Sequence, residues 1–393
     1  MSPRLAIAAI LALASPLAAA EPGRDVGFPI SVEQNTVYVA VTARGRPLGE
    51  FILDTGSQEV VLDSDAVHRA GVRSVGSATL TGAGRGNMDA EVLAPLTLAV
   101  GGAAIRLNEA FAAPIGARLA PFEDRRIGGL VGGRFFAEHV VEVDFAGRRV
   151  TLHDPARFAY RGDGVRIPLS FDHGAPVAAG ALVLADGRRL PLRLLVDLGA
   201  DASVLVGERF ARAHPELRRL APSLIEPLSA GVGGETRYAF ARLPGLEIGG
   251  DLTAGLAIGL SVNGSLSGAY YDALLGEPFL ARHRVIFDYP HRELILEPAA
   301  EAAPDAFDRS GAFLVQAGGP RLVVRAVAPG TPAAQAGVRP GDVLRALDGE
   351  AAETLTLARV RAALSAPGDH VVAILVRRRD REVPMSIRLR DLI

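Results

Sequence analysis

Hydrophobic positions alternate in short runs along most of the chain, as in strands that bury one face. Alternate positions of 141–145 and of 285–289 are hydrophobic, and each run is followed by a short turn and a second strand pattern, at 150–152 and 294–296. Glycine-containing turns separate these runs, and long helical patterns are few. The pattern predicts a mainly β protein in which one unit occurs twice.

Two apolar strand patterns end directly in an aspartate. Phe51–Leu53 leads into Asp54, and Leu194–Val196 leads into Asp197, and each aspartate is followed by a turn with a glycine. A carboxylate at the end of a buried strand is unfavourable unless it is paired or shares a proton. We therefore expect the two acids to meet, and the alternative is that each only caps its turn.

The similarity between the halves extends beyond these turns. Residues 130–139 (LVGGRFFAEH) reappear as 274–283 (LLGEPFLARH), 144 residues later, and the two aspartates are 143 residues apart. This repeat predicts two all-β lobes related by a pseudo-two-fold axis, with one aspartate from each at the axis. Pairing of the two lobes within one chain is the simpler geometry.

The order of these motifs resembles the pepsin and retropepsin aspartic proteases over residues 28–298. The resemblance implies two tandem β-barrel lobes and an Asp54/Asp197 catalytic dyad that activates water to hydrolyse peptide bonds, without a cofactor. The residues that it implies as support for the dyad are Thr55, Gly56, Ser57, Gly199 and Ala200.

This chain departs from the family beside the second aspartate. Leu198 stands where the relatives have a threonine that braces the dyad, so one half of the brace is missing. In the pepsin pattern Ser57 supports its aspartate, which favours an ionised Asp54 and places the shared proton on Asp197. Asp201 matches the position that holds substrate backbone in retropepsins, and its alternative is a solvated turn carboxylate.

Two glycine-rich hairpins are candidates for covering a bound peptide, because glycine permits close approach and hinge motion. Their candidate binding residues are Gly82, Gly84, Gly231 and Gly233. Ordinary hairpin turns are the alternative.

The C-terminal tail resembles the PDZ domains of bacterial periplasmic proteases, on residues 327–344. Thr331 is expected as a helix N-cap, Gly337 as the stop of that helix, and a second helix is expected at 357–364. The resemblance implies a loop and strand that bind a polypeptide segment or C-terminus, formed by Gly311, Ala312, Phe313 and Leu314. A PDZ fold that serves internal packing is the alternative.

The expected domains are a signal peptide (1–20), an N-terminal lobe (21–158), a C-terminal lobe (159–298), a linker (299–308) and the PDZ domain (309–393). Arg4, an apolar run from Leu5 to Ala14 and the small residues before Glu21 form the export pattern. An uncleaved anchor is the alternative. No later segment is long and apolar enough to span a bilayer, so we expect a periplasmic or secreted bacterial protein.

Composition excludes several kinds of chemistry. The 393 residues include no cysteine, and every basic residue is arginine, which excludes thiol and lysine nucleophiles. A net charge of −2 gives no general reason to bind nucleic acid. His139 and His283 lack metal-site spacing and are expected to be structural. The run 377–381, rich in arginine, is expected as a solvated hairpin turn, and a partner or membrane-surface patch is its alternative.

The leading hypothesis is thus an aspartic endopeptidase that acts on polypeptides and carries a PDZ domain. The alternative, motivated by Leu198, is a non-catalytic peptide-binding or scaffold protein with the same fold.

Overall fold

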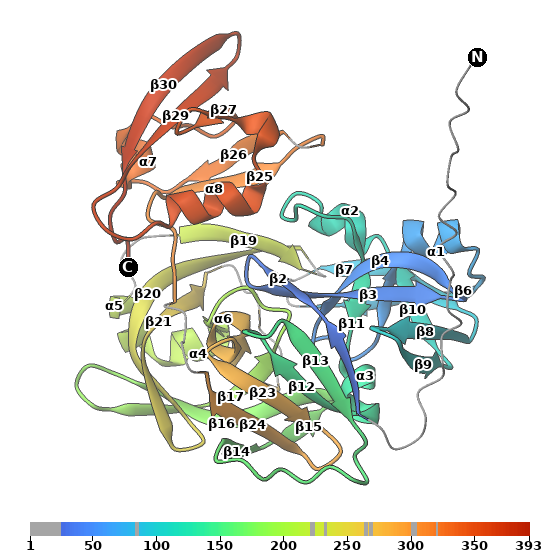
Figure 1. The fold of residues 1–393 in the computed structure, drawn as a ribbon. Coiled ribbons are helices and arrows are strands. Elements are labelled where there is room, and N and C mark those ends of the chain that lie inside the picture. Colours follow the sequence, from blue (N-terminus) through green and yellow to red (C-terminus); the bar gives the residue numbers. More distant parts are fainter. Residues whose placement is uncertain are drawn as a thin grey trace, which may run out of the picture.

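The computed structural model describes residues 25–82, 86–220, 225–231, 234–262, 266, 270–299, 305–319 and 321–393. The predicted signal peptide, Gly84 and Gly233 lie outside the described residues. Within these ranges the chain is mainly β and forms four sheets, which confirms the predicted fold class (Figure 1).

The N-terminal lobe is built on a ten-stranded sheet in the order β6-β7-β10-β5-β11-β4-β3-β8-β9, with β2 paired to β3. Its strands are β2 (Ser31–Glu33), β3 (Thr36–Ala43), β4 (Arg46–Leu53), β5 (Val61–Asp63), β6 (Ser74–Thr81), β7 (Asn87–Leu93), β8 (Leu96–Val100), β9 (Ala103–Leu107), β10 (Ala110–Ala113) and β11 (Ile127–Val131). Its helices are α1 (Ser64–Ala70), α2 (Ile115–Leu119) and α3 (Gly133–Glu138).

The C-terminal lobe repeats this plan with eight strands in the order β15-β16-β17-β22-β18-β21-β20-β19. The strands are β15 (Ser170–Asp172), β16 (Ala175–Val183), β17 (Arg189–Asp197), β18 (Val204–Val206), β19 (Ile225–Gly231), β20 (Gly234–Ile248), β21 (Asp251–Ser261) and β22 (Ala273–Gly276). The helices are α4 (Glu208–Ala213), α5 (Pro215–Leu220) and α6 (Glu277–Leu280). In both lobes the strand before the aspartate has a parallel neighbour, β11 beside β4 and β22 beside β17.

A six-stranded sheet joins the two lobes, in the order β1-β13-β12-β23-β24-β14. It contains β1 (Val26–Pro29), β12 (Val140–Asp144), β13 (Arg149–His153), β14 (Val165–Pro168), β23 (His283–Asp288) and β24 (Glu293–Pro298). The duplicated strands β12 and β23 are antiparallel neighbours, with Glu142 opposite Ile286. The predicted boundary between the lobes, at 158/159, falls between β13 and β14.

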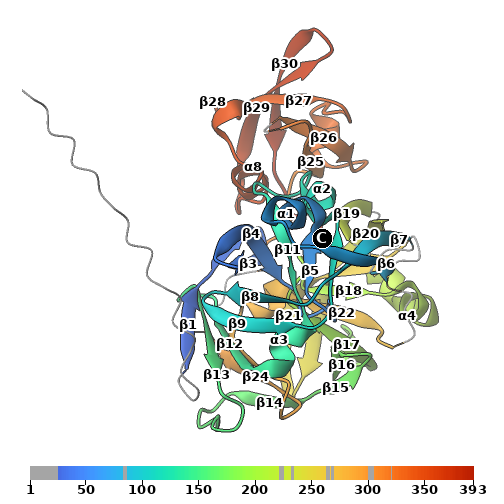
Figure 2. The same cartoon turned by 90° about the vertical axis from the view of Figure 1, so that its right-hand side faces the viewer.

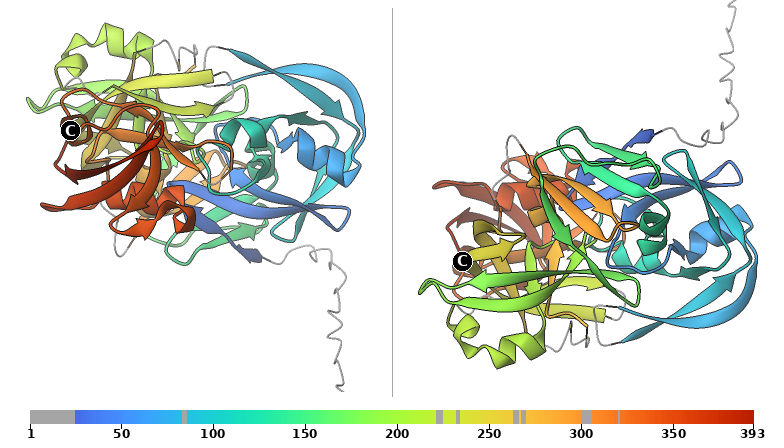
Figure 3. Two further views of the ribbon diagram at one scale, coloured as in Figure 1. Left: turned by 90° about the horizontal axis from the view of Figure 1, so that it is seen from above. Right: turned by 90° about the horizontal axis from the view of Figure 1, so that it is seen from below.

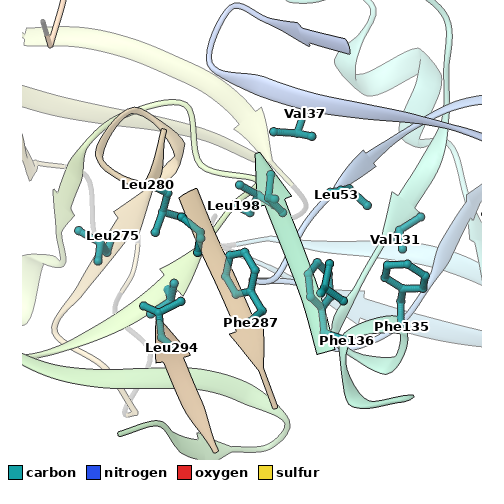
Figure 4. Close-up of a cluster of buried hydrophobic side chains, with 14 of the residues drawn as sticks. Val37, Leu53, Val131, Phe135, Phe136, Leu198, Leu275, Leu280, Phe287 and Leu294 are labelled. Atoms are coloured by element: carbon teal, nitrogen blue, oxygen red, sulfur yellow. The ribbon is translucent and has the colours of Figure 1, made fainter. Parts of the chain in front are cut away.

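The main hydrophobic core is continuous through both lobes. Phe136 of the first lobe and Phe287 of the second pack edge to face with ring centroids 5.3 Å apart, and Leu198 lies between the lobes in the same cluster (Figure 4). The site where Leu198 replaces a threonine is therefore filled by apolar packing.

The tail folds into a separate sheet in the order β25-β26-β27-β29-β30, with β28 on β27. The strands are β25 (Ala312–Gln316), β26 (Leu322–Val327), β27 (Val343–Leu347), β28 (Glu350–Ala351), β29 (Val371–Arg378) and β30 (Arg381–Arg388), and the helices are α7 (Pro332–Gln335), the short 3₁₀ helix η1 (Ala352–Thr354) and α8 (Leu357–Leu364). The predicted helix at 357–364 is confirmed, and the arginine-rich run forms the turn between β29 and β30. Thr331 is the N-cap residue of α7, although its hydroxyl donates to the Ala328 carbonyl instead of capping an amide.

The tail domain lies on the two lobes with β25 and α8 turned toward them and the β29–β30 hairpin turned away (Figures 1 and 2). Asp124 accepts hydrogen bonds from the first two amides of α8, at Leu357 (2.6 Å) and Ala358 (2.7 Å), and from Gln316 Nε2 (2.7 Å). The Gln316 amide donates to the Pro121 carbonyl (2.7 Å). One acidic side chain of the N-terminal lobe thus caps a helix of another domain.

We expect Asp124→Ala to weaken this docking by about 1–2 kcal/mol, since two helix amides and one side-chain amide lose their acceptor. Small-angle scattering of the full chain measures the result as a larger maximum dimension. Asp380→Ala, a change of the same kind in the exposed β29–β30 turn, is the control and is expected to leave the scattering curve as it is. An unchanged curve for Asp124→Ala would show that other contacts hold the domain.

Candidate functional site

The two aspartates lie at equivalent ends of the duplicated strands. Asp54 directly follows β4, and its amide donates to the Val131 carbonyl of β11 at 3.0 Å. Asp197 ends β17 and lies opposite Gly276 of β22. In each lobe the parallel neighbour therefore fixes the strand that delivers the carboxyl group.

The carboxyl groups of Asp54 and Asp197 lie close enough together for each to shift the pKa of the other. Each one also lies against the glycine of the opposite turn. A Cβ on Gly56 would lie 2.6 Å from Asp197 Cγ, and a Cβ on Gly199 would lie 2.7 Å from Asp54 Cγ. Any larger side chain at either position would separate the acids.

Backbone amides fix the orientation of both groups. The Ser57 amide donates to Asp54 Oδ1 (2.9 Å), and the Gly199 amide donates to Asp197 Oδ1 (3.0 Å). The expected role of the Ser57 hydroxyl is wrong in detail, because this hydroxyl donates to the Glu59 carbonyl (2.9 Å). Ala200, which matches Ser57 in the repeat, has no hydroxyl at all.

Burial raises the pKa of both acids, and the two shifts differ in size. For Asp54, hydrogen bonds from Ser57, Asp197 and Gly56 oppose the desolvation that raises its pKa. For Asp197, desolvation is reinforced by the neighbouring charge of Asp54, so its pKa lies well above the ordinary value. The arrangement favours an ionised Asp54 beside a protonated Asp197.

Half of the brace beneath the acids is present. The buried Thr55 hydroxyl donates to the Val196 carbonyl and accepts from the Leu198 amide, both at 2.8 Å. This single hydroxyl ties the first turn to the second. Leu198 is fully buried and supplies no hydroxyl in return.

A tyrosine that sequence reasoning missed lies beside this brace. The Tyr289 ring packs against Phe171 (centroids 4.8 Å apart) and Phe136 (5.6 Å). Its hydroxyl is buried near Thr55 but has no hydrogen bond of acceptable geometry among the described residues. Burial and the nearby acids raise the pKa of Tyr289 far above its usual range. No local pattern marks it, because its surroundings come from both lobes.

A cavity of about 1360 Å³ surrounds the dyad and is lined by both lobes and by the tail domain. Gly82 and Asp201 lie in its wall. Gly231 ends β19. Burial raises the pKa of Asp201, and the Asn35 side chain donates to its backbone carbonyl (3.1 Å).

The tail domain contributes its own groove to this cavity. Ala312, Phe313 and Leu314 of β25 line the cavity opposite residues of α8. The amide of Gly311 already donates to Asp308, and that of Ala312 donates to the Ser310 hydroxyl (3.0 Å). The first two amides of the expected carboxylate-binding loop are thus already satisfied, one by the last linker residue and one from within the domain.

Sequence reasoning also missed two charged residues in the cavity wall. Arg361 of α8 lies between the domains and donates to the Gln34 side chain and to the Phe122 carbonyl (3.4 Å). Glu277 is 2% exposed and lies in the second repeat block, directly after Gly276. The signal in the sequence was an acidic residue at the start of a helix, directly after the glycine of the repeat.

The two histidines at matching repeat positions are half-buried. Burial lowers the pKa of both His139 and His283, and His283 Nδ1 lies 3.3 Å from the Phe279 carbonyl. Among the residues that the structure describes, no cluster of three or more acids or histidines could hold a metal ion. No helix in this part of the chain is long and apolar enough to cross a membrane.

Comparison with known proteins gives two family matches. Residues 39–153 match the family described as aspartyl protease, and residues 323–378 match the PDZ domain. These matches confirm the resemblances drawn from the sequence motifs. The sequence matches none of the curated proteins with which it was compared.

Two solved structures are similar to about seven tenths of this chain. Basic 7S globulin from soybean has a TM-score of 0.44 and 10% identity, with 71% of this chain and 96% of that chain covered. An aspartic proteinase from Irpex lacteus has a TM-score of 0.47 and 13% identity, with 72% of this chain and 99% of that chain covered.

We expect Tyr289→Phe to raise the free energy of unfolding by about 1 kcal/mol, because a buried hydroxyl without a partner is removed. Chemical denaturation measures the difference. Tyr160→Phe is the matched control with the opposite sign, since the Tyr160 hydroxyl bonds to Glu297 and to the Gly164 amide, both at 2.6 Å. A loss of stability in Tyr289→Phe would mean that its hydroxyl has a partner in solution.

Proposed function

We propose that the protein is an aspartic endopeptidase in which Asp54 and Asp197 activate a water molecule. The observation that carries this proposal is that the carboxyl groups of Asp54 and Asp197, one from each lobe, lie side by side, each against the glycine of the opposite turn. Placing two carboxyl groups side by side away from bulk water is unfavourable, and a fold without catalysis would not require it.

The proposed reaction needs one proton on the pair. Ionised Asp54 takes a proton from the water while the water oxygen attacks the carbon of the peptide carbonyl. Protonated Asp197 donates its proton to the carbonyl oxygen. The tetrahedral intermediate then breaks its C–N bond while Asp54 gives its proton to the leaving amine and Asp197 takes back a proton from one hydroxyl of the intermediate, which restores the starting state of the pair. Gly56, Ser57 and Gly199 hold the carboxyl groups through backbone amides, so little reorganisation is needed during the reaction.

The cavity is suited to an extended polypeptide. It runs between both lobes and along β25, an edge strand of the tail sheet whose Gln316 amide already pairs with a carbonyl of the N-terminal lobe. A polypeptide added to the remaining edge would be held by main-chain hydrogen bonds. We therefore propose that the PDZ domain binds polypeptide segments or C-termini as part of the substrate path.

The second candidate is a peptide-binding scaffold without activity. It is favoured by Leu198, which removes half of the brace at the dyad, and by the docking of the PDZ domain over the cavity. Both candidates share the same polypeptide ligand class, and the dyad substitutions below separate them.

We also propose that the protein is exported, with cleavage after Ala20, and acts in the periplasm or outside the cell. The support is the export pattern of the first twenty residues. N-terminal sequencing of the mature protein should begin at Glu21.

We expect Asp54→Asn and Asp197→Asn each to lower kcat/KM for peptide hydrolysis by roughly 10³-fold or more, since the proton exchange needs both groups. Mass spectrometry of a diverse peptide library measures the cleavage. Circular dichroism controls for folding, and Asp380→Asn, in the exposed turn, should retain full activity. Peptide binding by the wild type without any cleavage would favour the scaffold.

The pH dependence should be bell-shaped and displaced upward. Activity falls at low pH as Asp54 becomes protonated and at high pH as Asp197 loses its proton, and the pKa of each is raised by burial. Both limbs should therefore lie above the pH of about 4 at which a solvated aspartate titrates. Rates of kcat/KM measured from pH 3 to pH 9 test this, and a maximum below pH 4 would contradict the assignment.

A further inference from the structure

Glu277 is a buried acid in the wall of the cavity. It is the first residue of α6, its side chain lines the cavity, and its amide donates to the Ala200 carbonyl at 2.9 Å. Gly276 packs so closely under this loop that a Cβ there would lie 2.1 Å from the Ala202 carbonyl oxygen. Glu277 is therefore fixed against the turn that carries Asp197.

The neighbour of Glu277 in this wall is a second acid, Asp201. The burial of Glu277 and the nearby charge of Asp201 together raise the pKa of Glu277 to about 7. Among the described residues, no ion pair or hydrogen bond reaches the carboxylate of Glu277. Arg361 acts on Asp201 from a distance, but its guanidinium group donates to Gln34 and Phe122. Two acidic side chains thus share one wall of the cavity.

The other lobe has neither acid at the matching positions. In the repeat, Asp201 corresponds to Gln58 and Glu277 corresponds to Gly133. Gln58 also lines the cavity. At these two matched positions the pseudo-two-fold pair is therefore acidic in the second lobe and uncharged in the first, which is a difference that the fold itself does not demand.

The cavity as a whole is lined by more acidic than basic side chains. Its described lining contains eleven carboxylic side chains and three arginines. A low-dielectric wall around such an excess concentrates cations and repels anions. A cationic group that enters the site would satisfy acids that are now unpaired.

We propose that Asp201 and Glu277 form a specificity pocket for a cationic side chain of the polypeptide substrate, arginine or lysine, on one side of the scissile bond only. This proposal rests on the proposed function in that it uses the same cavity. It adds the chemical class of the substrate and an asymmetry about the cleaved bond.

The test compares peptides that differ at one position in arginine or in citrulline, which has the same shape without the charge. The arginine is moved through each position on both sides of the cleaved bond, and kcat/KM is measured for each pair. In the wild type we expect arginine to exceed citrulline by about tenfold or more at one position on one side. Glu277→Gln should bring that ratio close to one, and Asp201→Asn should reduce it.

Glu109→Gln is the matched control, because Glu109 is an exposed acid that lines the same cavity from the N-terminal lobe, opposite the proposed pocket's own lobe. It should keep the arginine to citrulline ratio of the wild type. Equal rates for arginine and citrulline at every position would overturn the proposal, as would a ratio that Glu277→Gln leaves unchanged.

A second measurement separates this proposal from the catalytic one. Fluorescence anisotropy with Asp54→Asn reports peptide binding without cleavage, for the same arginine and citrulline peptides. Tighter binding of the arginine peptide that depends on Glu277 would support the pocket even if the wild type cleaved nothing. Cleavage without any preference for arginine would keep the peptidase and remove the pocket.

Discussion

Two carboxyl groups that lie side by side away from bulk water cannot both be ionised at low cost, and the two-lobed part of the chain is arranged around this constraint. The strands β4 and β17 bring Asp54 and Asp197 together, and glycines at 56 and 199 leave room for each acid against the opposite turn. Backbone amides and the Thr55 hydroxyl then hold the two turns in place. The continuous core beneath them, shared by both lobes, desolvates the pair from one side and makes it costly to ionise twice.

The parts of this arrangement that could be predicted are those written in local sequence. A strand pattern that ends in an aspartate and a glycine turn, found twice at a constant spacing, predicted the lobes and the two acids. The missing threonine at Leu198 was also visible, because it breaks a motif. The helix from Leu357 to Leu364 could be predicted from its own apolar spacing and its proline-glycine end.

The other features depend on which residues meet across the fold. Tyr289 reaches the dyad only because β23 pairs with β12, and its packing partners come from three separate segments. Asp124 caps a helix more than two hundred residues away, so no local pattern could identify it as a docking residue. The Ser57 hydroxyl donates to the Glu59 carbonyl, while the amide of the same residue donates to Asp54. Asp308 could not be foreseen either. Its carboxylate accepts from the Gly311 amide, which was expected to bind the carboxylate of a ligand.

The sheet shared by the two lobes determines how independent they can be. Its centre is the pairing of β12 with β23, and β14 of the second lobe lies at its far edge beside β24 (Figure 3). A polypeptide that ended after β13 would present β12 as an uncovered edge and would lack one of its two acids. Either half alone would thus expose a strand edge that can pair with other chains, and it would carry only one acid of the pair. It could complete the sheet by pairing with the other half or with a copy of itself. The tandem arrangement turns what would be a bimolecular assembly into folding of a single molecule, whose effective concentration of the second half is independent of how much protein the cell makes.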